Sequence, residues 1–95
     1  MAGGATYVPT VLFNEIVGET IDALPPEVPP VERCVLFAVA MDFQREGPEA
    51  IFDVERIARR CTLPEKATKR CLEALKSAGH IDDMRRRFEQ ARIIA

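Results

Sequence analysis

Two groups of basic side chains, at two places in the second half of the chain, are candidates for binding phosphate. The first place is a segment of helical pattern that carries Lys66, Lys69 and Arg70. The second is the run Arg85, Arg86 and Arg87 near the C-terminus, with Arg92 beyond it. Lysine and arginine neutralise nucleic-acid phosphates, and both also bind guanine edges in the major groove of DNA. Both places are therefore candidate contacts for a polyanion.

The two halves of the chain carry opposite charge. Residues 1–53 hold two basic and nine acidic side chains, residues 54–95 hold eleven basic and six acidic ones, and the formal net charge is −2. A phosphate would feel the local field of the second half. The acidic half is either a solubilising surface or the site of a basic protein partner.

Patterns for catalysis and for metal binding are missing from the sequence. The cysteines Cys34, Cys61 and Cys71 lack a C-x-x-C spacing, and His80 is the only histidine. We interpret the cysteines as reduced, mostly buried thiols that act as small hydrophobic residues. The phosphate-binding, dinucleotide-binding and zinc-protease motifs are also absent. We expect a protein that is not an enzyme and has no cofactor and no metal.

Length and composition indicate one small globular domain over residues 1–95. The chain is 47% hydrophobic and 29% charged, which is close to average usage. No apolar run reaches the roughly 18 residues that span a bilayer, and the N-terminus does not resemble a secretory signal. We expect a cytoplasmic, nucleoid-associated protein with no membrane contact.

Two helices should precede the basic segment. Residues 1–28 would form an N-terminal helix, which begins near Pro9, and a stiff connector with four prolines among residues 25–30. This helix either packs on the core or forms a homodimer interface, and we favour the homodimer. The next helix should run from near Pro30 to about Arg45. The apolar positions of the first helix are Leu12, Phe13, Ile16 and Val17.

The strongest pattern follows in residues 53–81, which should form two short helices joined by a tight turn. Asp53 suits the cap of the first helix, T-L-P-E at residues 62–65 fits a capping box for the second, and Gly79 suits its end. Such a pair is a helix-turn-helix, whose second helix can enter a DNA major groove. The second helix should bury Cys71, Leu72, Leu75 and Ala78.

The stretch IARRCTLPEKATKRCLEALKSAGHI resembles the winged helix-turn-helix of bacterial transcription regulators and of phage or plasmid replication proteins. The upstream YVPTVLFNEI resembles the DNA-binding part of phage replication protein O and related initiators. The chain departs from the family at Pro64, Glu65 and Thr68. Glu65 would repel phosphate, although glutamate can also accept a hydrogen bond from cytosine. The matching positions are Ile57, Ala58, Leu63, Arg70, Leu72, Leu75, Gly79 and Ile81.

The resemblance implies a mainly α fold with a small β-hairpin wing, in which a three-helix core over residues 29–95 follows an extra N-terminal helix. It implies binding of double-stranded DNA, in replication initiation or in transcription regulation. The alternative is a winged-helix protein–protein interaction module within a larger assembly. The predicted interface consists of Lys66, Lys69, Arg70 and Glu73 at the groove, with Arg85, Arg86, Arg87 and Arg92 on the DNA backbone or in the minor groove.

Residues 80–95 fit two structures. As a wing, residues 80–84 and 89–94 would be strands and residues 85–87 the tip. As a helix, the segment would bury Met84, Phe88 and Ala91 on one face. The absence of a glycine, asparagine or proline for a tight turn favours the helix. The resemblance and the pair Ile93 and Ile94 favour the wing, and we predict the wing.

Overall fold

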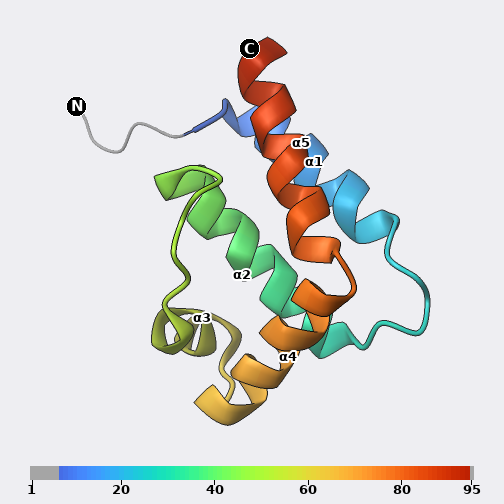
Figure 1. The fold of residues 1–95 in the computed structure, drawn as a ribbon, viewed down its shortest axis with the longest axis vertical. Coiled ribbons are helices and arrows are strands. Elements are labelled where there is room, and N and C mark those ends of the chain that lie inside the picture. Colours follow the sequence, from blue (N-terminus) through green and yellow to red (C-terminus); the bar gives the residue numbers. More distant parts are fainter. Residues whose placement is uncertain (1–6, 95) are drawn as a thin grey trace.

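The computed structural model describes residues 7–94, and its regular structure consists of five α-helices (Figure 1). Helix α2 lies in the middle and contacts each of the other four. Helices α1 and α5 pack against each other, as do α3 and α4. None of these helices is long and apolar enough to cross a membrane. The helices are α1 (Thr10–Asp22), α2 (Pro30–Glu46), α3 (Val54–Cys61), α4 (Glu65–Ser77) and α5 (His80–Ile94).

The connector between α1 and α2 is fixed by a single arginine. Arg33 donates from Nη1 to the carbonyl of Ile21, 3.2 Å away, and from Nη2 to that of Pro25, 2.9 Å away. Its Nε donates to the carbonyl of Val28 at 3.2 Å. One of these carbonyls lies in the last turn of α1 and two lie in the connector, so the arginine adds a charged donor to backbone acceptors on both sides of the end of the helix. Arg33 therefore sets how the chain passes from α1 into α2.

The apolar side of α1 packs on the core. Ile16 and Val17 are buried, and the half-buried Leu12 and Phe13 lie against the same cluster. Their neighbours belong to α2 and α5, the helices that α1 contacts. The stripe that suggested a homodimer interface is thus covered within one chain.

The predicted wing is wrong, because residues 80–94 form helix α5 and residues 7–94 contain no strand. Four apolar residues of α5 lie at helical spacing and are buried: Ile81, Met84, Phe88 and Ala91. In a strand of period two, Met84 would instead share its face with Asp82. Gly79, at φ 83°, lets the chain turn after α4 and start a new helix.

Phe88 explains why the core needs α5 as a helix. Its ring is fully buried, with its centroid 5.6 Å from that of Phe43 on α2 and 6.1 Å from that of Phe13 on α1. A buried aromatic side chain contributes more apolar area than any aliphatic one. Helix α5 thus packs beside α1 and α2, in the part of the chain where the resemblance had implied a wing.

Helices α2, α3 and α4 contact one another, and α3 and α4 are the two short helices predicted for residues 53–81, joined by residues 62–64. The prediction for the start of α3 is confirmed, because Oδ1 of Asp53 accepts the backbone N–H groups of Glu55 and Arg56. The predicted capping box is wrong. Thr62 adopts the left-handed conformation at φ 55° and ends α3, while α4 begins after Pro64 without a side-chain cap.

Candidate nucleic-acid interface

The outer face of α4 carries four cations that reach solvent. Lys66, Lys69, Arg70 and Lys76 are all exposed. Within residues 7–94 none of them forms an ion pair with a carboxylate. The pair between Lys69 and Glu73, which the spacing of four residues permits, is likewise not formed. The cations of α4 are therefore free to bind a ligand.

The inner face of α4 explains why these cations point outward. Thr68, Cys71 and Leu75 are buried at helical spacing, and α4 contacts α2 along this side. Thr68 stands where the family resemblance has an aliphatic residue. Its hydroxyl donates to the carbonyl of Pro64 at 3.0 Å, so its burial leaves no unpaired polar atom.

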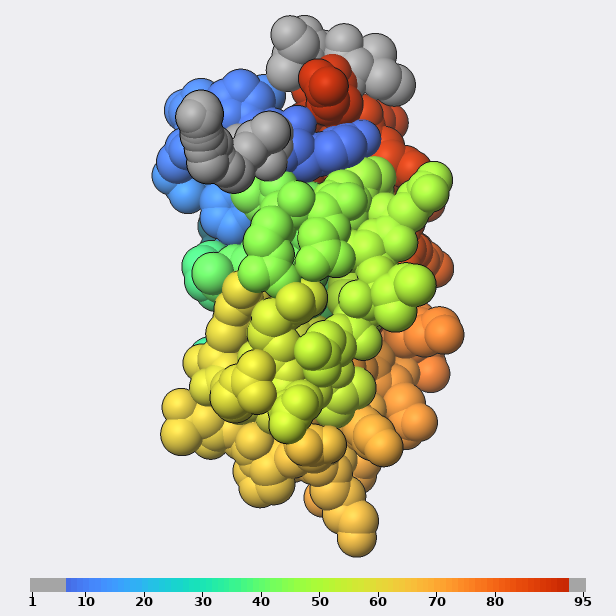
Figure 2. Space-filling model, turned by 90° about the vertical axis from the view of Figure 1, so that its left-hand side faces the viewer, coloured from blue at the N-terminus to red at the C-terminus, as the bar shows by residue number. Residues whose placement is uncertain are grey.

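The position of α4 in the molecule also makes its face accessible. Figure 2 shows the turn between α3 and α4 and the first part of α4 at one end of the molecule, with α1 at the other end. The first turn of α4 has no side-chain cap among the described residues, so its backbone N–H groups remain available. A helix N-terminus favours an anion, although Glu65 in the first turn opposes one. The two carboxylates on this face, Glu65 and Glu73, are exposed with the four cations.

The predicted tail arginines are bound within the chain. Arg85 pairs with Asp82, donates from Nε to the carbonyl of Pro48 at 2.8 Å and lies over the ring of Phe43. Arg86 lies 3.5 Å from Asp83, and its side chain is 68% exposed. Of the three consecutive arginines, Arg86 alone faces mainly solvent.

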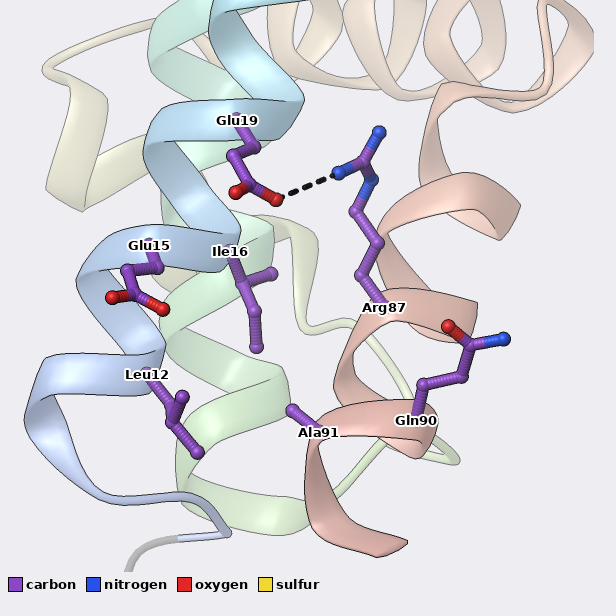
Figure 3. A pocket seen from close by; sticks show the side chains of 7 residues that line it. All are labelled: Leu12, Glu15, Ile16, Glu19, Arg87, Gln90 and Ala91. Carbon is purple, nitrogen blue, oxygen red and sulfur yellow. Dashed lines mark hydrogen bonds and ion pairs between the residues drawn. The ribbon is translucent and has the colours of Figure 1, made fainter. Parts of the chain in front are cut away.

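Arg87 and Arg92 are held at the other side of α5, beside α1. Arg87 lies 3.1 Å from Asp83 and 3.2 Å from Glu19, and it spans the groove between α5 and α1 (Figure 3). This groove of about 220 Å³ has Ile16 on its apolar floor. The guanidinium of Arg92 stacks over the ring of Tyr7, 5.7 Å from its centroid. The structure therefore does not bring these two arginines together with the cations of α4.

One predicted tail residue does lie beside α4. Arg85 lines a groove of about 200 Å³ together with Glu73 and Lys76, between α4 and α5. Its side chain is 33% exposed, and Asp82 already neutralises it. Arg85 therefore has less free charge to offer a ligand than Lys76.

Sequence reasoning missed the role of Asp42. This aspartate is fully buried in α2, and its Oδ1 lies 3.3 Å from Arg56, 3.3 Å from Arg60 and 3.6 Å from Arg45. Two arginines of α3 thus attach that helix to α2. The signal that could have found it is the placement of an acidic residue within the apolar stripe of α2, next to Phe43.

The described residues around this surface include no candidate metal site. Within the described part of the chain, no group of three or more histidine, cysteine or acidic side chains could hold a metal ion. The cysteines are only partly as predicted, because Cys71 is buried while Cys34 is exposed. Comparisons with protein-family models, with curated proteins and with solved structures gave no match.

Proposed function

We propose that this chain binds double-stranded DNA without chemical change, through the outer face of α4. The observation that supports the proposal is the contrast between two basic regions. The tail arginines have acidic or aromatic partners within the chain, whereas Lys66, Lys69, Arg70 and Lys76 have no ion-pair partner within residues 7–94.

The helix-turn-helix unit gives this surface a means of docking. In that motif the first helix holds the second so that its N-terminal part reaches base edges in the major groove. Lys66, Lys69 and Arg70 occupy that part of α4, while Lys76 lies closer to its end. Lysines would contact phosphates, and Arg70 would contact a phosphate in random-sequence DNA or a guanine edge at a specific site. A role in replication initiation or transcription regulation is the corresponding biological proposal.

The test measures the affinity for a random-sequence duplex by fluorescence anisotropy at several salt concentrations. The double variant Lys69→Ala and Arg70→Ala removes two cations from α4. The matched variant Arg86→Ala and Arg92→Ala removes two exposed cations from α5. We expect the slope of log K against log salt to become shallower by about 2 in the α4 variant, since each phosphate contact contributes about 0.9.

Two results would overturn the proposal. Absence of binding by the wild-type chain at low salt removes DNA as the ligand. Equal losses in the α4 and α5 variants mean that net charge, and not the face of α4, governs the binding.

A second candidate function is suggested by the carboxylates on the same face. Glu65 and Glu73 interrupt the cations of α4, and such mixed charge suits an acidic protein surface that also carries basic residues. In that case the chain is a protein–protein interaction module. An acidic polypeptide that binds the wild-type chain more tightly than duplex DNA does, at the same salt concentration, would favour this reading.

A further inference from the structure

Two of the three cysteines line one groove where α2 contacts α3. Cys34 lies on α2 and is exposed, and Cys61 is the last residue of α3 and is half-buried. Both line a groove of about 280 Å³, together with Phe37, Met41 and Arg60. The groove gives a small molecule access to both thiols, which stand 27 positions apart in the sequence.

The two thiols line the same groove from neighbouring helices, and Cys34 is close enough to affect the titration of Cys61. A disulfide between them requires the side chains to bring the two sulfur atoms to about 2 Å from each other. Burial raises the pKa of the Cys61 thiol, and the neighbouring Cys34 and Cys71 raise it further, while Arg60 opposes the shift. Cys34 is therefore the more accessible thiol, and Cys61 is the one placed to react second.

We propose that Cys34 and Cys61 form a reversible intramolecular disulfide when the chain meets a small-molecule disulfide such as oxidised glutathione. The bond would tie α2 to the end of α3, directly before the turn that leads into α4. It joins the same two helices that Asp42 holds through its arginines. This assignment does not depend on DNA binding.

The chemistry is thiol–disulfide exchange in two steps. The thiolate of Cys34 attacks one sulfur of the oxidant, the sulfur–sulfur bond of the oxidant breaks, and one thiolate leaves and takes up a proton. The thiolate of Cys61 then attacks the Cys34 sulfur of the mixed disulfide and expels the second thiolate. Two protein thiols are oxidised, one small disulfide is reduced to two thiols, and both protons end on the released thiols.

The sequence makes the linkage easy to map. Each cysteine directly follows an arginine, so trypsin releases the three cysteines on separate peptides, residues 34–45, 61–66 and 71–76. The full chain is incubated with oxidised glutathione, the remaining thiols are alkylated, and the non-reduced digest is analysed by mass spectrometry. We expect peptides 34–45 and 61–66 to be joined and peptide 71–76 to be alkylated, with reversal by dithiothreitol.

Two variants sharpen the result. Cys61→Ser should stop the reaction at a mixed disulfide of Cys34 with glutathione, and Cys71→Ser should leave the linkage as in the wild type. Glutathione that remains on Cys34 of the wild-type chain would overturn the proposal. So would a bond from either cysteine to Cys71, or a covalent dimer through Cys34. The wild-type map decides the question even if one variant fails to fold.

Discussion

Replacement of Asp42 by asparagine tests how α3 is held on α2. The change preserves the shape of the side chain and removes the negative charge. The guanidinium groups of Arg56 and Arg60 then face a neutral amide in place of the carboxylate whose Oδ1 lies 3.3 Å from each. Removal of one partner from a fully buried ion pair costs about 3–5 kcal/mol, because the other charge is left without compensation.

The expected cost for Asp42→Asn is smaller, for a reason visible in the structure. Asp42 has no exposed side-chain area, but the side chains of Arg56 and Arg60 are 25% and 26% exposed. Water can therefore solvate the arginines once the charge is gone. We expect the free energy of unfolding to fall by about 2–3 kcal/mol, as for loss of a hydrogen bond to a charged group. For a domain of this size that lowers Tm by roughly 10–20 °C.

Urea titration and thermal melting, both followed by circular dichroism, measure the effect. Glu55→Gln is the matched control, since it neutralises an acidic partner of α3 whose pair with Arg59 is exposed and 3.8 Å long. That control should stay within about 0.5 kcal/mol of the wild type. If the urea concentration at the midpoint of unfolding is the same for Asp42→Asn and the wild type, the charge contributes no net stability. Packing alone then attaches α3 to α2.

Three further predictions concern the core, the connector and the thiols. Phe88→Ala should lower the free energy of unfolding by about 3–5 kcal/mol in urea titration, because the fully buried ring leaves a cavity; a loss below 1 kcal/mol, roughly the cost of an exposed substitution, would contradict the assigned packing of α5. Arg33→Ala should cost about 2–3 kcal/mol, because three backbone carbonyls lose a charged donor; unchanged stability would mean that water replaces those bonds. Burial raises the pKa of the Cys61 and Cys71 thiols above the ordinary 9.0, so iodoacetamide should alkylate Cys34 first at neutral pH.

The same two thiols also predict how the stability of the fold changes at alkaline pH. A thiol whose pKa is higher in the folded state keeps its proton longer there than in the unfolded chain. Stability is therefore full below about pH 9 and falls as the pH rises above it. A Cys61→Ser variant should lose less stability than the wild type between neutral and alkaline pH, and an equal loss in both would assign the effect to other groups.

The helices before residue 80 could be predicted because their signals are local. Prolines at the start of α2, Asp53 before α3 and an apolar period of three to four residues each act within one or two turns of chain. The exposed cations of α4 followed from the same period, since residues opposite a buried stripe must face solvent. The helical period did not predict that those cations would lack an ion-pair partner.

In residues 80–95, local sequence signals did not decide the predicted structure. The sequence by itself determined a helical period in residues 81–91 and the absence of a tight-turn residue, and these were outweighed by a resemblance to winged proteins. Only the tertiary structure decided the outcome, because the buried position of Phe88 between α1 and α2 requires a helix in that space.

The tertiary structure also decided which charged side chains form ion pairs. The sequence determined how many arginines the second half contains and that three of them are consecutive. It could not determine that Glu19, from the first helix, reaches Arg87, or that Asp42 gathers Arg56 and Arg60 from a helix far along the chain. Ion pairs depend on distances of a few ångströms between side chains distant in sequence, and only packing sets those distances. The cations that packing left unpaired on α4 are the ones on which the proposed function rests.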